Sequence, residues 1–560
     1  GKVRLDPCVH ALASVLNTLL GYDWMAAENG GSCSVAARSA LWDPSDLSAA
    51  NRIVSAHTKV VNEILPSLPD AYRDQVRVIV DQRAANAIYL ALLESPAAGS
   101  GDTSGGLDAA LGSYDQSADL LNQIAAGTST LGRSTETSCL KSAVGAQAES
   151  LLARVNSAAS GLFSPRPLAI ASNPDVSVSQ WVYGFTSEPD LENYLDAQEQ
   201  SAISLEAGAT PLVKLMHSVG SQSAAIATWQ KYDKDISKLA AKVPNSPIAE
   251  LTNYIQSDLD SIDPQHGCKV AVSGGSTDKF LNLRSQLAEL ALARCEQVAI
   301  VRYNAIATAF SQLLAGHFPF SANMDTRPGA ESDPTRIAQF YAVFDHDSPG
   351  LAGALETAVA NPIMAQNFLE SLAQLRPIVL SSAAPPAPAL SVAVRFGTNR
   401  EHEYLADHIA QWTLNLGQQT ISSTTSAGAA LPQWQYGEPV TLNVRYAFDS
   451  PILPAAANPS SAAQVEGTTV TYTYNDAWSL IALLADHPAD IVGVQNQYSV
   501  NIPNRYVAAN TTTAPKDTVA YMQIELLPAG AKPGAEPLTV PPFPFAAPAL
   551  TPKTDVETVQ

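Results

Sequence analysis

The first 315 residues follow the spacing of amphipathic helices, with apolar side chains recurring every three or four positions. Pro66 and Pro69 punctuate this pattern and separate two expected helices. The first helix is marked by Ile53, Val54, His57, Val60, Val61, Ile64 and Leu65, and the second by Val76, Ile79, Val80, Ala84, Ala87 and Leu90.

A later helix in this region has a recognisable start. Residues 273–278 (Ser-Gly-Gly-Ser-Thr-Asp) predict a loop that ends at a helix cap, with Thr277 or Asp278 providing the capping oxygen. The helix that follows should pack on a neighbour through Phe280, Leu283, Leu287 and Leu290. Residues 96–106, rich in Gly and Ser, predict a flexible loop.

After about residue 378 the pattern changes from helical spacing to alternation. Residues 383–389 (Ala-Ala-Pro-Pro-Ala-Pro-Ala) predict a stiff spacer, and several period-two runs follow it. These runs, separated by Gly, Pro and Asn, indicate antiparallel strands that form a sandwich. One short helix interrupts them, with Trp478, Ile481, Ala482 and Ala485 on a shared face. The alternating positions include Leu390, Val392, Val394, Phe396, Val440, Leu442, Val444, Tyr446, Val470, Tyr472 and Tyr474, with residues 519–527 as the last run.

The predicted fold class is therefore α+β multidomain: a long all-α helical-bundle region followed by a C-terminal antiparallel β-sandwich-like domain. Four segments are expected: a helical stalk or bundle at 1–270, a helical domain and junction at 271–377, the β domain at 378–527, and a tail at 528–560. Eight prolines between Pro528 and Pro552 predict that the tail is extended and poorly ordered.

Composition excludes some classes of protein. The 560 residues are 46% hydrophobic and 15% charged with a mean hydropathy of 0.00, which favours a folded chain over a disordered one. The formal net charge of −21 makes nucleic acid an improbable partner, because such a chain repels phosphates. No run of 18 apolar residues predicts a membrane span. Gly1 in place of a starting Met indicates a processed protein or part of a longer one.

Five cysteines lack any CxxC pair, and their odd number leaves one thiol over. Two loop-closing disulfides are conceivable, Cys8–Cys33 and Cys268–Cys295. The alternative is that these cysteines are buried and reduced.

Two motifs partly match a phosphate-binding loop and a zinc site, but the residues around them do not fit either site. Gly127-Thr-Ser-Thr-Leu-Gly132-Arg133-Ser134 has the spacing of a phosphate-binding loop, but Arg133 replaces the lysine and a helical segment precedes it. His402 and His408 are six residues apart, whereas a zinc-binding helix needs histidines four apart.

The other candidates are weaker still. Asp345-His346-Asp347 is more typical of a turn than of a cation site, and His266-Gly267-Cys268 lacks the rest of a metal framework. A Gly-x-Ser-x-Gly elbow is missing. The sequence therefore assigns no catalytic, cofactor-binding or metal-ligating residue, and predicts a protein that is not an enzyme.

The region around residue 320 carries a family resemblance. His317-Phe-Pro-Phe320 follows a long helix, and Asp333-Pro-Thr-Arg-Ile-Ala-Gln-Phe-Tyr-Ala-Val-Phe344 comes next, with Gly350 close behind. This order resembles the IcmF/TssM family, the large inner-membrane subunit of type VI secretion systems. The family has an Arg-Tyr-Pro-Phe element, an acidic loop and a Phe-x-x-Phe-Phe helix. His317-Phe318 stands where Arg-Tyr is usual.

Four more elements follow in the family's order. Val392-Ala-Val-Arg-Phe396 is similar to the strand that opens the family's β domain, and Leu414-Asn-Leu-Gly-Gln418 to its strand and turn. Gln433-Trp-Gln-Tyr-Gly-Glu-Pro439 falls at the Trp-Pro-Gly element, and Ala477-Trp-Ser-Leu-Ile-Ala-Leu-Leu484 resembles a Trp-containing helix. The resemblance covers about residues 317–527.

The resemblance implies the periplasmic portion of a scaffold whose membrane anchor lies outside this chain. Its copies would self-associate into pillars around a channel, with an inner-membrane TssL-like subunit as a neighbour. The β domain would bind a TssJ-like outer-membrane lipoprotein. The expected site residues have structural roles. Phe318 and Phe320 should lock the turn from helix to loop, Trp434 and Trp478 should pack inside the β domain, and Pro319, Phe340 and Phe344 are the other structural residues.

Two other functions compete with the scaffold. A cell-envelope hydrolase would need a deep pocket with perturbed titratable groups. A freestanding adhesin or binding module would be monomeric and complete without membrane spans.

Overall fold

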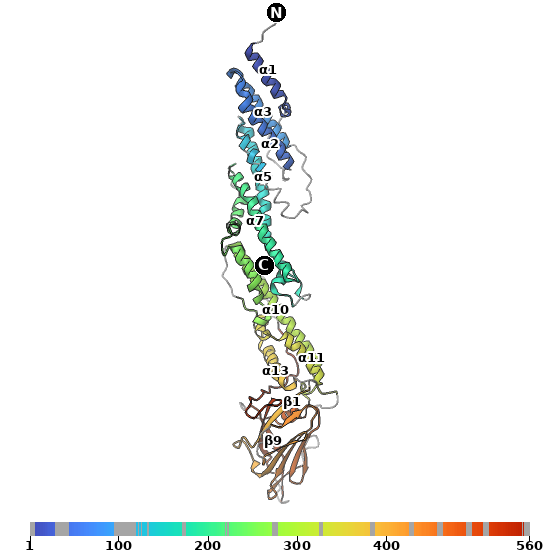
Figure 1. The fold of residues 1–560 in the computed structure, drawn as a ribbon. Coiled ribbons are helices and arrows are strands. Elements are labelled where there is room, and N and C mark those ends of the chain that lie inside the picture. Colours follow the sequence, from blue (N-terminus) through green and yellow to red (C-terminus); the bar gives the residue numbers. More distant parts are fainter. Residues whose placement is uncertain are drawn as a thin grey trace. The chain divides into compact units, whose positions relative to one another are not determined.

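The fold divides into two compact units, Gly1–Ser261 with Val270–Ala291 and Ile262–Lys269 with Leu292–Gln560. In the first the described elements are helical, whereas the second carries helices followed by antiparallel sheets, so the expected α+β class is confirmed (Figure 1). The computed structural model describes residues 6–27, 44–93, 119–131 without 121 and 125, 134–170, 175–218, 220, 223–270, 278–323, 329–380, 387–424, 431–455, 463–488, 495–507, 515–551 and 553.

The first unit contains the two helices expected on either side of Pro66 and Pro69. The first of them, α2, continues through a π turn at Val60–Ile64 and a 3₁₀ turn at Leu65–Ser67 before α3 begins. Its described helices are α1 (Pro7–Leu20), α2 (Pro44–Lys59), α3 (Asp70–Leu93), α5 (Ser134–Gly161), α6 (Val178–Tyr183), α7 (Glu188–Ser218), α8 (Ala224–Ala240) and α9 (Pro247–Asn253), joined by the first turns of α10 (Lys279–Leu313). The expected loop at 96–106 lies outside the described residues.

The stripe predicted for α10 faces the core of the first unit. Phe280, Leu283 and Leu287 are buried, whereas Leu290 is half-buried. Phe280 meets Phe163 edge-to-face, with ring centroids 6.4 Å apart. The cap is Asp278, whose Oδ1 accepts the main-chain N–H groups of Phe280 at 2.9 Å and of Leu281 at 3.2 Å.

The first segment of the second unit, Ile262–Lys269, is covalently linked to α10. Cys268 and Cys295 form a disulfide, which confirms one of the two conceivable pairings. Gly350 (φ 69°) packs so closely on this segment that a Cβ there would lie 2.3 Å from the carbonyl oxygens of Pro264 and Gln265. The other conceivable disulfide, from Cys8 to Cys33, is not formed, since Cys8 is a free, exposed thiol. The remaining helices of this unit are α11 (Pro334–Asp347), α12 (Leu351–Ala358), α13 (Ile363–Val379) and α14 (Ser479–Asp486).

The strands of the second unit form two larger antiparallel sheets and a two-stranded one. Their orders are β4-β1-β11-β9, β3-β2-β5-β8-β7 and β10-β6. Phe396 of β1 stacks on Trp412 of β2 with centroids 5.3 Å apart, which joins the two larger sheets. The bounds are β1 (Ala389–Phe396), β2 (Ile409–Leu416), β3 (Gln419–Ser422), β4 (Gln433–Gln435), β5 (Val440–Tyr446), β6 (Ile452–Pro454), β7 (Ala463–Glu466), β8 (Thr469–Tyr474), β9 (Gln497–Ile502), β10 (Asn504–Tyr506) and β11 (Thr518–Pro528).

The predicted alternation is clearest in the middle of the five-stranded sheet. Every second residue of β5 and β8 is buried, including Leu442 and Tyr472. The short helix expected here is present as α14, and Trp478, Ile481 and Ala482 are buried. Ala485 is exposed, however, and residues 479–484 are buried on every side of the helix. The helix packs against β5 and β8, and Trp434 contacts its first residue, Ser479, so little of its surface faces solvent.

The described part of the tail is extended, as expected, but it is not loose. Leu538 donates its N–H to the carbonyl of Leu526 at 2.8 Å, and Phe543 packs edge-on against Phe320 with centroids 5.4 Å apart. Near its end, Ala360 donates to the carbonyl of Thr551 at 3.0 Å. The expectation of poor order is therefore wrong for residues 528–551, because prolines that prevent regular structure still permit docking on helices.

Of the helices that the structure describes, none combines the length and the apolar character needed to cross a membrane.

Replacing both Cys268 and Cys295 by Ser should lower the free energy of unfolding of the second unit by about 3 kcal/mol. The disulfide closes a loop between residues separated by 27 positions, and its removal restores entropy to the unfolded chain. Urea unfolding followed by tryptophan fluorescence measures the loss. Cys8→Ser is the control, and an equal effect of both changes would contradict this role.

Candidate functional site

The motif His317-Phe-Pro-Phe320 lies where α10 ends and the chain turns back. Phe318 donates its N–H to the carbonyl of Ala330 at 2.8 Å, and Ser332 donates to the carbonyl of Phe318 at 2.8 Å. The Phe318–Pro319 peptide bond is cis. Phe318, Pro319 and Phe320 are all buried, so the motif and the segment before α11 form one short paired structure.

Trp478 connects this paired structure to the β region. Its indole N–H donates to the carbonyl of Ser332 at 2.9 Å, and both residues are fully buried. Trp478 was expected inside the β domain, and the structure places it at the edge where β strands meet helices. We call residues 317–320, 330–333, 433–439 and 477–479 the junction.

Trp434 occupies the other side of the junction. Its indole N–H lies 3.0 Å from Ser479 Oγ and 3.1 Å from the carbonyl of Glu438, and Ser479 Oγ donates to that same carbonyl. Tyr436 packs edge-on against Trp478, with centroids 5.1 Å apart. The segments 433–439 and 477–479, distant in sequence, are thereby fixed to each other.

Beside the junction lies a cluster of aromatic rings from α10, α11 and α13 together with Phe320. Phe310 of α10 sits at its centre, with edge-to-face contacts to Phe320, Phe340 and Phe368 at centroid distances of 5.8, 5.9 and 5.2 Å. Phe344, also buried, lies 5.9 Å from Phe340. Such edge-to-face pairs add directional attraction to the burial of apolar area.

Tyr436, half-buried at the junction, keeps its proton at neutral pH. Burial, reinforced by the nearby Glu331 and Asp333 carboxylates, raises the pKa of Tyr436 to about 12. Burial also raises the pKa of the Glu331 carboxyl, against a hydrogen bond from the main chain of Ala477. A neutral phenol and indole N–H groups bonded to carbonyls suit packing and positioning.

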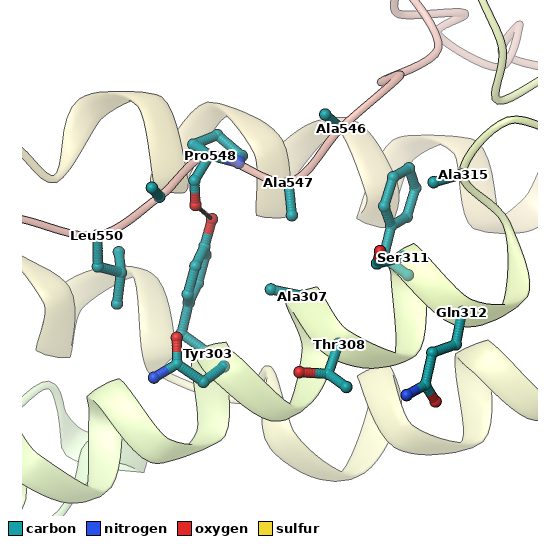
Figure 2. A pocket seen from close by; sticks show the side chains of 13 residues that line it. Tyr303, Ala307, Thr308, Ser311, Gln312, Ala315, Ala546, Ala547, Pro548 and Leu550 are labelled. Atoms are coloured by element: carbon teal, nitrogen blue, oxygen red, sulfur yellow. Dashed lines mark hydrogen bonds between the residues drawn. The ribbon is translucent and has the colours of Figure 1, made fainter.

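A second feature of this unit is a cavity of about 470 Å³ between α10 and the tail. Tyr303 spans one end and donates its hydroxyl to the carbonyl of Pro548 at 2.7 Å (Figure 2). Thr308, Ser311 and Gln312 line the helical wall opposite Ala547. Burial raises the pKa of Tyr303 to about 12, so the hydroxyl remains a donor throughout the physiological range.

The motifs that invited catalytic interpretations are dispersed. His402 lies in a turn and His408 ends a short 3₁₀ helix (Ala406–His408), so the two do not share one helix. Gly132 and Arg133 lie outside the described residues. Asp345 is engaged by Arg376, with Arg376 Nη2 2.7 Å from Asp345 Oδ2. Within the described ranges, no three His, Cys, Asp or Glu side chains gather as metal ligands would.

Sequence reasoning missed the acceptors of the two indoles and the centre of the aromatic cluster. Ser332, Glu438 and Ser479 act through main-chain carbonyls or a hydroxyl, for which the sequence carries no signal. For Phe310 the sequence does carry a signal. It lies at helical spacing with Tyr303, Ile306 and Leu314, and these residues continue the buried face of α10.

Neither a family model, nor a curated protein, nor a solved structure matches this chain.

Trp478→Phe should lower the free energy of unfolding of the second unit by about 2–3 kcal/mol. The change removes ring packing and also leaves the buried carbonyl of Ser332 without a donor, which itself costs about 1–3 kcal/mol. Denaturant unfolding measures the loss. Trp412→Phe, which removes a buried indole that stacks on Phe396, is the matched control. Equal losses from the two changes would contradict a specific role for the Trp478 hydrogen bond.

Tyr303→Phe should loosen the tail without unfolding the unit. Loss of one hydrogen bond of about 1 kcal/mol should increase the detached population about fivefold. Chymotrypsin cleavage after Phe545, followed by mass spectrometry, reports that population. Tyr341→Phe removes a buried hydroxyl bonded to the carbonyl of Leu372 in α13 and serves as the control. Similar cleavage rates in both variants would argue against tail anchoring by Tyr303.

Proposed function

We propose that this chain is a structural scaffold of a type VI secretion membrane complex, the periplasmic portion of an IcmF/TssM-type subunit. It acts without catalysis, contributes to pillars that surround the secretion channel, and docks a TssJ-like outer-membrane lipoprotein through its β region. Its further partners are copies of itself and a TssL-like inner-membrane subunit.

The observation that carries the proposal is the convergence of the resembling elements at the junction. His317-Phe-Pro-Phe320 pairs with the segment before α11, Trp478 binds that segment, and Trp434 binds the residue after Trp478. The quoted elements near 392–396 and 414–418 form β1 and the β2–β3 turn. The sequence elements that resemble the family therefore lie in one connected part of the second unit. We expect this of elements that a family would keep together for structural reasons.

The buried contacts of the junction, in which a protonated phenol and two indole N–H groups take part in packing, favour the scaffold over the hydrolase. A hydrolase needs a nucleophile or a general base in contact with an accessible cavity. The residues that line the cavity beside α10 include the hydroxyls of Thr308 and Ser311, but among them there is no His, Asp, Glu, Lys or Cys to act as a base, and the phenol of Tyr303 is held protonated. Measured hydrolytic turnover by the purified chain would favour the alternative.

Binding to the lipoprotein tests the proposal directly. The whole chain would be immobilised and exposed to the purified soluble form of the outer-membrane lipoprotein from the same organism's secretion system, with an unrelated lipoprotein as control. We expect saturable binding to the first and none to the second. Absence of saturable binding at native salt would contradict the proposal.

Phe448→Ser should weaken that binding about tenfold or more without changing stability. Phe448 is fully exposed in a turn closed by the Ser450 N–H and the Ala447 carbonyl, and exposed Tyr506 and Val507 lie on the adjoining strand end. Aromatic side chains are enriched at binding hot spots. Ile363→Ser on α13, 63% exposed and outside the β region, is the matched control. Equal affinities of the two variants would exclude this turn as the contact.

A further inference from the structure

The tail after β11 lies on the surface of the second unit, although it covers side chains that are fully buried. Each described residue from Ala529 to Thr551 is half-buried or exposed. By contrast, Phe320, on which Phe543 packs, is 0% exposed, and Tyr303, which bonds to the tail, is 1% exposed. The tail therefore contributes to the cover of the core without being enclosed in it.

Few hydrogen bonds fix the far part of the tail, residues 539–551. Among the described residues, its main-chain groups bond at two positions only. The Pro548 carbonyl receives the Tyr303 hydroxyl, and the Thr551 carbonyl receives the N–H of Ala360. The cavity of about 470 Å³ lies between these residues and α10, so the tail is not closely packed on the helix along its length (Figure 2). Release of the tail breaks no sheet and few hydrogen bonds.

Two consecutive turns, which we call the hinge (residues 529–535), connect β11 to this part of the tail. Main-chain hydrogen bonds of 3.0 and 3.1 Å close them across residues 528–531 and 532–535. Gly530 and Gly534 have φ angles of 76° and 89°, which glycine adopts without strain. Both glycines are exposed, and the hinge is tied to β1 through the Gly530 N–H, which donates to Ser391 Oγ at 3.0 Å. An extended hinge therefore requires little loss of packing.

We propose that two copies of this chain exchange their tails, so that residues 536–551 of each copy dock on α10 of the other. Both copies have one sequence, so the contacts made within a chain are reproduced between chains, and the hinge alone changes conformation. Exchange of an identical element is a low-cost route to a dimer. Because the tail lies on the surface, no threading of the chain is needed.

The distribution of charge favours a second copy as the partner. Copies with a net charge of −21 repel each other, so a stable contact between them needs surfaces that carry little charge. Residues 536–551 contain one charged side chain, Glu536, and residues 303–315 of α10 contain none. An extended chain covers at most about 3.5 Å per residue, so residues 536–551 reach roughly 55 Å, far enough to meet a neighbouring copy.

This inference rests on the proposed function in one respect, since it specifies how copies of the scaffold associate. It is tested without the lipoprotein. Tail exchange is therefore open to failure while lipoprotein binding succeeds, and the reverse holds as well.

Isotope mixing of the whole chain distinguishes tails docked within a copy from tails docked between copies. Ala307 of α10 and Ala547 of the tail lie on the two sides of the cavity (Figure 2). Ala307→Cys and Ala547→Cys would be combined with Cys8→Ser, which removes the exposed thiol. Unlabelled and ¹⁵N-labelled forms are mixed in equal amounts, incubated at high concentration and treated with a short bismaleimide. Monomer and dimer are then separated by size, and the cross-linked peptides are identified by mass spectrometry.

In the dimer we expect roughly half of the cross-linked peptides that join positions 307 and 547 to combine a labelled with an unlabelled partner, as random exchange requires. In the monomer both partners should carry the same isotope. A dimer whose cross-linked peptides are all of one isotope would overturn the proposal, and so would the absence of a dimer.

Substitutions in the hinge provide a second, independent measurement. Gly530→Val and Gly534→Val strain the closed turns, because a β-branched residue is disfavoured at positive φ, and extension of the hinge relieves that strain. Each should raise the association constant of the dimer at least about fivefold. Gly467→Val, at a φ of 62° in the turn between β7 and β8 and with free space around its Cβ, is the matched control. Equal dimer fractions in the hinge and control variants, each shown to be folded by circular dichroism, would contradict tail exchange.

Discussion

The carbonyl of Ser332 is the point at which the helices and sheets of the second unit meet. It receives the indole N–H of Trp478, while the N–H of Ser332 itself bonds to Phe318. Because both side chains are excluded from water, the geometry of this contact constrains the end of α10, the start of α11 and α14 together. The aromatic cluster around Phe310 packs next to this contact, through Phe320.

Much of this architecture was accessible from the sequence, because it rests on periodicity. The change from helical spacing to alternation near residue 378 located the β region, and β5 and β8 obey the alternation throughout. Helix punctuation by Pro66 and the cap at Asp278 were also visible, since their backbone chemistry is local. The buried positions of Phe318, Trp434 and Trp478 followed from their size and apolar character.

What the sequence could not reveal depends on partners that are distant in the chain. The hydrogen bond from the Trp478 indole to the Ser332 carbonyl joins residues 146 positions apart, and nothing in the sequence around Ser332 marks that carbonyl as an acceptor. The tail contradicted a compositional rule, since proline content describes what a segment cannot form and leaves open whether another surface holds it. Tyr303, 245 positions from Pro548, provides that surface.

The strand order also determines when the sheets of the β region can be completed during synthesis. In the sheet β4-β1-β11-β9, the central strand β11 pairs with both β1 and β9, yet it is the last of the strands to be synthesised. While the chain is being made, β1 and β9 therefore wait with unpaired edges until Thr518–Pro528 emerges. Long-range pairing of this kind folds slowly and exposes edges that other chains can join. The two strands can therefore complete their sheet only after β11 has been made.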